Sequence, residues 1–553
     1  MQGAVCVLIK QIQNFYNEHG KKPIYFLPYI IFLLFSFGYS LTRNTLSIDD
    51  LAGQYYSGSF AGAMVEQGRW EDVLYNFLIN CTDFSQYIYK FAATVVLAFV
   101  GFLFAALLYS FNDNKKKIPT QSYMLISSLF ITCPFIFEFW KFTGTDFIVA
   151  CNMLIVLVSF LHLAYGRRKY VWKILITGIV LSIVASSYES VLVLYISIVL
   201  FYLFYKYCIN SEQQKNKFEW IKVGTKFIPP IVIAVILRFV IGFILMAVFS
   251  VEKTETATNT MFLWDSNISE CVSSFLSIFT YNYLFNLQYL PILVFFVSVI
   301  LFIVATVYSS IKNNKILPIL LGALCLISLF LIPIATLNSL TLSYRMQQPV
   351  LMFVPFSMFV FSNMFIGKKH IFKSLLFVLL IASVFQSTCM SRMFELANIR
   401  SENESAVINY IGSEIKNKYP HKKVVVAGEY HFSEYLNDRI KHEKSDWDIT
   451  TKLFRQTALD GGIGEWSIPQ DFESVINWAN GSQYIFDEKN MLQTLFSYYG
   501  YDLDVINIKN VDEFYSYEAI AKENNMSEMQ IKNVGDYILV YLGEITNPQL
   551  YFY

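Results

Sequence analysis

The chain has 553 residues, of which 55% are hydrophobic and only 15% are charged, and its mean hydropathy is +0.44. Soluble domains carry about 25% charged residues, so this composition excludes an ordinary soluble protein and indicates an integral membrane protein. The formal net charge is zero and no basic stripe is present, which argues against nucleic acid as a partner.

Eleven apolar runs approach the length of about 20 residues that a membrane-spanning helix needs. They lie at 24–41, 87–110, 122–138, 146–165, 171–187, 189–206, 227–249, 288–310, 316–337, 347–366 and 370–388. The fifth and sixth runs form one stretch from Val171 to Tyr205, and a single helix of that length would far exceed a bilayer core of about 30 Å. The polar break at its middle, Ser186 to Ser190, therefore predicts two short crossings joined by a turn.

Lys and Arg residues are distributed unevenly between the connections. Clusters precede the first run and follow every even-numbered run, whereas the connection 42–86 holds only Arg43 and Arg69 against six acidic residues. Because cytoplasmic loops carry an excess of Lys and Arg, we expect residues 1–23 in the cytoplasm and the C-terminus outside. This orientation makes 42–86 and 250–288 outer loops; whether Cys81 and Cys271, which lie in them, form a disulfide stays open.

The first outer loop opens with two adjacent carboxylates, Asp49 and Asp50, in the sequence Ser47-Ile48-Asp49-Asp50. Residues 51–67 are mildly amphipathic, and they predict an interfacial helix that ends at Gly68-Arg69-Trp70. Acidic residues at a helix N-terminus are common caps, so a structural role is one alternative. One Asp satisfies a cap, however, and the second is left for binding or chemistry.

Residues 390–553 have a different composition from the membrane region. Hydrophobic runs shorten, charge rises, and short strand-like segments appear at 423–427, 503–508 and 537–542. This pattern predicts a small extracytoplasmic α/β domain. No nucleophile elbow, phosphate-binding loop or metal-ligand spacing is present in it, so we expect it to bind, cover or dock rather than catalyse.

Other polar residues beside the apolar runs fall on the predicted outer face, where ionisable groups suggest function. These are Arg43, Glu138, Lys141, Asp146, Tyr188, Glu189, Tyr344 and Arg345. Several have a structural alternative: Arg43 can extend toward headgroups, and Glu138, Lys141 and Asp146 can form a local ion-paired turn. Glu189 can serve turn structure alone, and Trp70 and Tyr188 can be interfacial aromatics instead of sugar-stacking groups. Arg345 stands alone in its short loop, and a guanidinium suits a bidentate grip on phosphate.

An outer-face carboxylate beside outer-face arginines suits transfer from a phosphorylated lipid. Arg345 or Arg43 would hold the lipid phosphate, while Asp49 or Asp50 would accept the proton of an acceptor hydroxyl that attacks the donor carbon. The departing phosphate then needs a positive charge, which an arginine supplies.

The pattern of residues over about 25–390 resembles the GT-C glycosyltransferases, and within them the phage-type O-antigen glucosyl transferase (Gtr) family. The similarity is carried by Ser47 to Asp50, by Gly68-Arg69-Trp70, by the turn at 139–146, by Ser187 to Ser190 and by Arg345. It implies an all-α polytopic membrane fold over 24–389 in a bacterial cytoplasmic membrane. It also implies a glucose donor on undecaprenyl phosphate, a cell-surface glycan acceptor, inversion, and Asp49 as the likelier base. The resemblance implies no cofactor and no catalytic metal, although a divalent ion stays an open alternative. Glu189 departs from the family pattern.

Two alternative functions remain open from the residues. A Wzy-like glycan polymerase or ligase would depend on arginine-rich outer loops, and this chain has few outer arginines. A transporter or lipid flippase would show internal repeats and charges within its spans. Arg238, inside the seventh run, is the residue that best suits transport.

Overall fold

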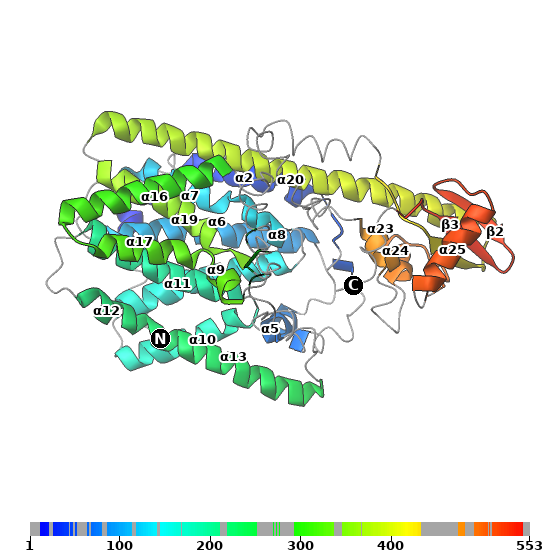
Figure 1. Cartoon of the computed structure of the whole chain (residues 1–553), viewed down its shortest axis with the longest axis horizontal. Helices are drawn as coiled ribbons and strands as arrows, with labels where there is room; N and C mark the ends of the chain where they lie inside the picture. The colour runs from blue at the N-terminus through cyan, green and yellow to red at the C-terminus, as the bar shows by residue number, and fades with distance from the viewer. Residues whose placement is uncertain are drawn as a thin grey trace. The chain divides into compact units, whose positions relative to one another are not determined.

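The structure is a computed structural model of the whole chain, shown in Figure 1. It describes residues 12–20, 26–43, 45–47, 50–51, 64–65, 68–79, 86–112, 118–140, 144–166, 169–187, 189–210, 218–251, 269, 272–273, 276, 292–336, 346–365, 368–432, 474–481, 491–506, 508 and 511–545. Most of the predicted interfacial helix at 51–67 and most of the second outer loop at 250–288, including Cys271, lie outside these residues, as does Cys81.

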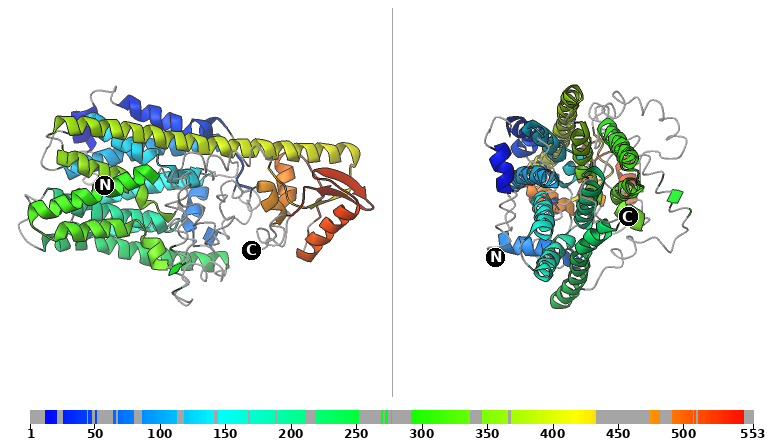
Figure 2. Two further views of the ribbon diagram at one scale, coloured as in Figure 1. Left: turned by 45° about the horizontal axis from the view of Figure 1, so that its top comes forward. Right: turned by 90° about the vertical axis from the view of Figure 1, so that its left-hand side faces the viewer.

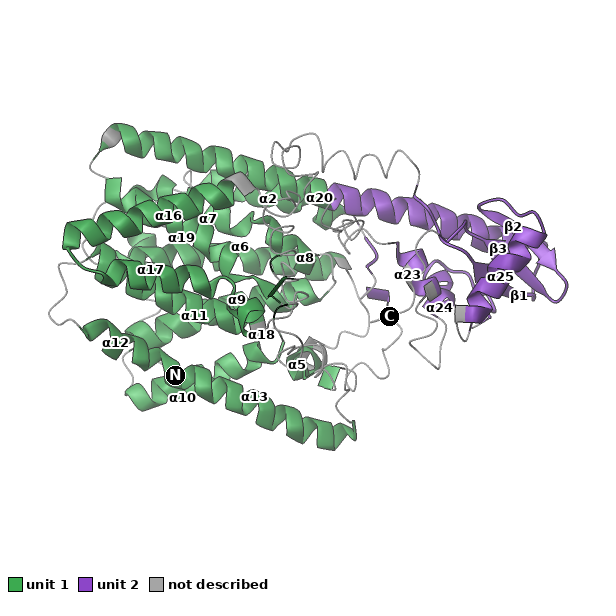
Figure 3. Cartoon of the chain, in the orientation of Figure 1, with its two compact units in different colours: residues 1–42, 59–393, 448–458 green, residues 43–58, 394–447, 459–553 purple. Residues whose placement is uncertain are grey.

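The chain divides into two compact units, which Figure 3 colours separately. Unit 1 comprises residues 1–42, 59–393 and 448–458, and unit 2 comprises residues 43–58, 394–447 and 459–553. Unit 2 therefore unites a segment of the first predicted outer loop with the C-terminal part of the chain. Composition alone does not indicate this grouping.

Unit 1 is built from helices. They are α2 (Leu27–Thr42), α5 (Trp70–Ile79), α6 (Gln86–Phe111), α7 (Thr120–Ile131), α8 (Phe137–Trp140), α9 (Thr145–Tyr165), α10 (Tyr170–Ala185), α11 (Glu189–Phe204), α12 (Glu219–Gly224), α13 (Ile228–Phe249), α16 (Ile292–Asn313), α17 (Leu317–Ser328), α18 (Leu331–Thr336), α19 (Pro349–Phe365) and the first half of α20 (Lys369–Lys418).

The predicted apolar runs are helical. Among the described residues, seven helices are long and apolar enough to cross a membrane, and α2, α10, α17 and α19 are shorter apolar helices. Each of the eleven predicted runs coincides with one of these helices. Several long apolar helices fit a helical membrane protein, while the number and direction of the crossings stay predictions.

The break inside the stretch from Val171 to Tyr205 is a turn, as the sequence predicts. α10 ends at Ala185, Ser186 and Ser187 form the turn, and α11 begins at Glu189. The amide N–H groups of both turn serines donate to carbonyls of the last turn of α10. The two helices contact each other.

α11 lies at the centre of unit 1, where it contacts α9, α10, α17 and α19. The end-on view in Figure 2 shows the helices of this unit running roughly along one direction. α13, by contrast, packs on α10, and most of its apolar side chains are exposed. Such an exposed apolar helix is typical of contact with lipid, because hydrocarbon tails are as apolar as these side chains. Arg238 on α13 places its guanidinium 5.7 Å from the centroid of the Phe239 ring.

Unit 2 contains a small mixed sheet and several helices, which confirms the predicted C-terminal α/β architecture. Its elements are the second half of α20, β1 (Lys423–Ala427), α23 (Val475–Gly481), α24 (Met491–Tyr498), α25 (Val511–Glu523), β2 (Gln530–Val534) and β3 (Tyr537–Tyr541). The strand order is β1-β3-β2, with β1 and β3 parallel and β2 and β3 antiparallel. The predicted strand at 503–508 is reduced to one parallel bridge between Val505 and Val424.

The boundary between the units falls inside one continuous helix. α20 runs from Lys369 to Lys418, and its residues up to Met393 belong to unit 1 whereas those from Phe394 belong to unit 2. Composition changes near residue 390, but Ala, Glu, Met and Ile around that point are compatible with helix, so the helix continues through the change.

Gly178 of α10 should not tolerate a methyl group. A Cβ at this position would lie 2.6 Å from Cγ2 of Ile233 on α13, so the two helices would have to separate. We expect Gly178→Ala to lower the thermal unfolding midpoint of the detergent-solubilised protein, through an overpacking cost of about 1–3 kcal/mol. Gly242→Ala is the matched control, because a Cβ there meets nothing within 4 Å. Equal midpoints for the two variants would contradict this packing.

Candidate functional site

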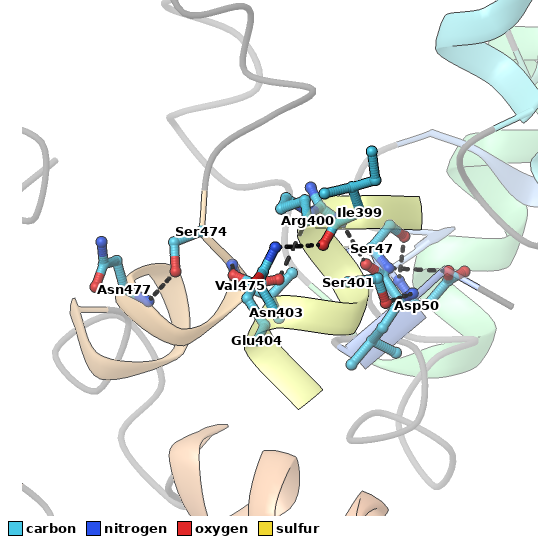
Figure 4. Close-up of polar contacts among 11 residues, drawn as sticks. Ser47, Asp50, Ile399, Arg400, Ser401, Asn403, Glu404, Ser474, Val475 and Asn477 are labelled. Atoms are coloured by element: carbon cyan, nitrogen blue, oxygen red, sulfur yellow. Dashed lines mark hydrogen bonds and ion pairs between the residues drawn. The ribbon is translucent and has the colours of Figure 1, made fainter. Parts of the chain in front are cut away.

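The segment that opens the first outer loop begins a helix. The Leu51 N–H donates to the Ser47 carbonyl at 3.1 Å, which is an α-helical bond, and Asp50 and Leu51 are helical. The Asp50 N–H donates to Ser47 Oγ at 3.1 Å, and the Ser47 N–H donates to Asp50 Oδ2 at 3.2 Å. This reciprocal pair is a capping box, with Ser47 as N-cap and Asp50 in the third helical position (Figure 4).

The capping box assigns a structural role to one of the two predicted catalytic carboxylates. Asp50 is half-buried and its carboxylate closes the helix start, which is the cap that an Asp at this position is expected to provide. Asp49 lies outside the described residues, together with Ile48. Of the two carboxylates, that of Asp50 has the capping role.

Arg43 precedes this segment. Its Nη1 lies 3.7 Å from Oε1 of Glu402 on α20, and both side chains are well exposed, at 58% and 60%. Exposed ion pairs of this kind contribute at most about 1 kcal/mol. Arg43 therefore loses little if its guanidinium turns to another anion.

In unit 1, a glycine ends one helix just ahead of α5. The Gly68 N–H donates to the Val65 carbonyl, the Arg69 N–H donates to the Met64 carbonyl, and Gly68 has φ of +75°. These two bonds form a Schellman motif, in which the left-handed conformation favours glycine. A helix therefore ends at Gly68, where the sequence predicts a helix end, and Trp70, which is buried, begins α5. That this helix lies at the membrane interface stays a prediction.

The first turn of α5 brings an acidic pair, Glu71 and Asp72, into the protein. Glu71 is fully buried, and Asn152 on α9 donates to its Oε2 at 3.0 Å. Ser187 in the α10–α11 turn donates to Asp72 Oδ1 at 3.4 Å. Glu71, Asp72 and Asn152 are not among the residues predicted from the sequence. The available signal is a second acidic pair, Glu-Asp, directly after Gly-Arg-Trp.

Burial is the main cause of the raised pKa values of Glu71 and Asp72. Desolvation raises the pKa of Glu71 well above its usual range, and the hydrogen bond from Asn152 opposes this only in part. Desolvation also raises the pKa of Asp72 to about 6, against the lowering effects of the Arg69 charge and the Ser187 hydroxyl. Glu71 is therefore held in its neutral form over a wider pH range than an exposed glutamate.

The α10–α11 turn connects two of the predicted site segments. Ser187 bonds to Asp72, which lies three residues after Arg69, while Ser190 Oγ accepts a hydrogen bond from Gln348 Nε2 at 3.0 Å. Gln348 is fully buried and directly precedes α19. The predicted turn thus contacts the first turn of α5, just after Gly68-Arg69-Trp70, through one serine and the start of α19 through another.

Asp146 is buried at the start of α9. Its Oδ1 accepts hydrogen bonds from the Gly144 N–H at 3.0 Å and the Phe147 N–H at 2.7 Å. Gly144 has φ of +91°, a left-handed conformation in which glycine is favoured. This geometry supports the structural alternative for Asp146, whose carboxylate accepts backbone donors at the helix start. The predicted ion pair with Lys141 stays a prediction, because Lys141 lies outside the described residues.

Some of the predicted site residues belong to segments that the structure does not describe. Lys141, Tyr188, Tyr344 and Arg345 lie outside the described residues, and Glu189 is described only through its backbone at the start of α11. Within the described part of the chain, no group of three His, Cys, Asp or Glu side chains is arranged to hold a metal ion. The described polar groups around the turn are carboxylates, hydroxyls and carboxamides, which are the groups that bind sugar hydroxyls.

Comparison with known proteins gives one match. A family model described as glucosyl transferase GtrII matches residues 38–367, which is more than half of the chain and extends from the end of α2 through α19. No curated protein and no solved structure gives a significant match. The matched range includes Asp49, the acidic pair on α5, the α10–α11 turn and Arg345, and it ends before unit 2 resumes at Phe394.

Asp72→Asn should stabilise the protein more at pH 7.5 than at pH 4.5. Burial raises the pKa of Asp72 from 3.8 to about 6, so the folded state binds a proton more tightly than the unfolded state. This contribution to stability is lost as the pH rises through 6, where the buried carboxyl group ionises. Asn has the same shape, keeps an acceptor for Ser187 and cannot ionise. Thermal unfolding at the two pH values measures the difference, with Asp536→Asn, on the exposed β2–β3 turn, as control. Equal gains at both pH values would refute the assignment.

Proposed function

The chain belongs to the glucosyl transferase GtrII family, and from this premise we propose that it transfers glucose from polyprenyl phosphate to a cell-surface glycan. The reaction takes place on the outer face of a bacterial cytoplasmic membrane. The observation that carries the proposal is the family match over 38–367, because it covers the apolar helices and the first outer loop together. The family description supplies the sugar, and the membrane helices favour a lipid-borne donor.

The orientation follows from the charge distribution. Lys and Arg residues gather in the connections after the even-numbered apolar runs, which places the loop that contains Asp49 outside the cytoplasm. A donor carried on a polyprenyl chain reaches this side laterally from the bilayer. The acceptor, a glycan of the cell surface, is present on the same side.

The proposed chemistry is a single displacement at the anomeric carbon. Asp49 accepts the proton of an acceptor hydroxyl as its oxygen bonds to the anomeric carbon, and the bond from that carbon to the phosphate oxygen breaks on the opposite face. The configuration is inverted, and polyprenyl phosphate leaves as an anion. A general base contributes about 10²–10⁴-fold to such a step. The capping role of Asp50 supports Asp49 as the base, because Asp50 already accepts the Ser47 N–H.

Two arginines suit the leaving phosphate. Arg345 is the sole charged residue in its short loop, and a planar guanidinium matches phosphate geometry bidentately. Arg43 is a second candidate, since its exposed pair with Glu402 is weak. Arg69, Trp70, Lys141, Asp146, Tyr188, Glu189 and Tyr344 remain proposed donor- or acceptor-binding residues. The contacts of Ser187 with Asp72 and of Ser190 with Gln348 support the α10–α11 turn as a wall of the sugar-binding site.

Asp49→Asn should abolish transfer while the protein stays folded, because the carboxamide keeps the shape of the side chain but cannot accept the proton. We expect kcat to fall about 10²–10⁴-fold. Asp50→Asn is the matched control, since an amide oxygen can still accept the Ser47 N–H and preserve the capping box. Purified variants are incubated with polyprenyl-phosphate glucose and acceptor glycan, and transfer is followed by mass spectrometry. Comparable losses in both variants would show that Asp49 is not the base.

Arg345→Ala should weaken donor binding more than it slows the bound reaction. Loss of a charge-assisted contact to phosphate costs about 1.5–3 kcal/mol, so the donor KM should rise about tenfold or more. Arg392→Ala, which removes an exposed arginine on α20, should leave the KM unchanged. Donor titrations of the two variants provide the comparison. An unchanged donor KM in Arg345→Ala would rule out the phosphate role.

A further inference from the structure

We propose that the C-terminal domain is a positioning element of the transfer reaction, in which Arg400 and Ser401 of α20 hold the backbone of the first outer loop next to Asp49. The inference rests on the proposed function, because it takes Asp49 as the base. It assigns a role to unit 2, most of which lies beyond the matched family range. Residues 43–58 belong to unit 2 rather than to the helical membrane unit.

The first contact is a buried guanidinium. Arg400 Nη2 donates to the Leu46 carbonyl at 2.6 Å, and the Arg400 side chain is only 6% exposed. The two residues are 354 positions apart in the sequence. Figure 4 shows Arg400 and Ser401 on one turn of α20 beside the segment that contains Ser47 and Asp50.

Arg400 is itself fixed by a carboxylate. Its Nε lies 3.5 Å from Oε2 of Glu404 one turn along α20, and the Glu404 side chain is 4% exposed. The other oxygen of Glu404 accepts the Val475 N–H at 2.6 Å at the start of α23, where Ser474 is the N-cap. A buried charge is stable only when it is paired and hydrogen-bonded, and this chain of contacts satisfies that condition.

A second hydrogen bond and two apolar anchors complete the clamp. The Leu46 N–H donates to Ser401 Oγ at 3.4 Å, so both backbone groups of Leu46 bond to α20. Leu46 and Leu51 are buried in the core of unit 2, with side chains such as Leu492 and Val540. The clamp therefore acts on residues on both sides of Asp49 in the sequence.

The chemistry of a general base makes this clamp relevant to rate. A base acts only within about 2.6–3.2 Å of the proton it removes, and a misplacement of about 1 Å can cost about 100-fold in rate. The capping box sets the local conformation of the segment, but it does not fix the segment to the rest of the protein. Arg400 and Ser401 supply that attachment, so they are positioning residues for Asp49.

The test uses the full chain in detergent or nanodiscs and two mild variants. Arg400→Lys keeps a positive charge beside Glu404. An ammonium, however, lacks the planar guanidinium geometry with which Arg400 contacts the Leu46 carbonyl and Glu404 together. Ser401→Ala removes one hydrogen bond and leaves the ion pair intact. Ser413→Ala is the matched control, because Ser413 lies on the same helix, is half-buried and donates a hydrogen bond to the nearby Tyr410 carbonyl.

We expect Arg400→Lys to lower kcat about tenfold and Ser401→Ala to lower it two- to threefold, with the donor KM within twofold of wild type. Amide hydrogen exchange over residues 45–51 should accelerate in both variants and not in Ser413→Ala. A purely structural role would lower the yield of folded protein without this selective loss of kcat. Unchanged exchange would overturn the clamp, and faster exchange with unchanged kcat would overturn its positioning role. Wild-type protein that transfers no glucose would instead overturn the proposed function, while the exchange measurement still decides whether the clamp exists.

Discussion

The free-energy cost of burying a carboxylate constrains three segments of this protein, which contain Glu71, Asp146 and Glu404. Glu71, Asp146 and Glu404 are all nearly or fully inaccessible to solvent, and each accepts at least one hydrogen bond. Asn152 bonds to Glu71, backbone N–H groups bond to Asp146, and Arg400 with the Val475 N–H binds Glu404. Because a buried acid without hydrogen-bond partners costs free energy whether it is charged or neutral, each of these acids favours the loop conformation that supplies its donors.

In the polar turn between α10 and α11, two serine hydroxyls connect the turn to two other segments of unit 1. Ser187 and Ser190 carry short side chains, yet one contacts α5 and the other contacts the residue before α19. A hydroxyl both donates and accepts, so it bonds equally well to a carboxylate and to a carboxamide. The break that splits a long apolar stretch is therefore also the place where distant loops meet.

Much of the membrane unit could be predicted from local pattern. Apolar runs mark the helices, the polar break at Ser186 to Ser190 marks the turn, and Gly68 marks a helix end, because each depends on neighbouring residues alone. Contacts across long sequence separations could not be predicted in this way. The bond from Asn152 to Glu71 and that from Arg400 to the Leu46 carbonyl leave no periodic signal. β2 was missed as well, since its residues, Gln530 to Val534, are mostly polar.

The membership of residues 43–58 in the C-terminal unit also has a consequence for biogenesis. Leu46 leaves the ribosome early, but its hydrogen-bonding partner Ser401 is 355 residues further along the chain. Contacts between residues so far apart in the sequence form late in folding, because the long intervening chain must first be closed into a loop. The outer segment beside Asp49 therefore stays without its native core until most of the polypeptide has been translated and inserted. A nascent chain released before α20 and α24 would carry the earlier helices of unit 1 but would lack the partners of residues 43–51.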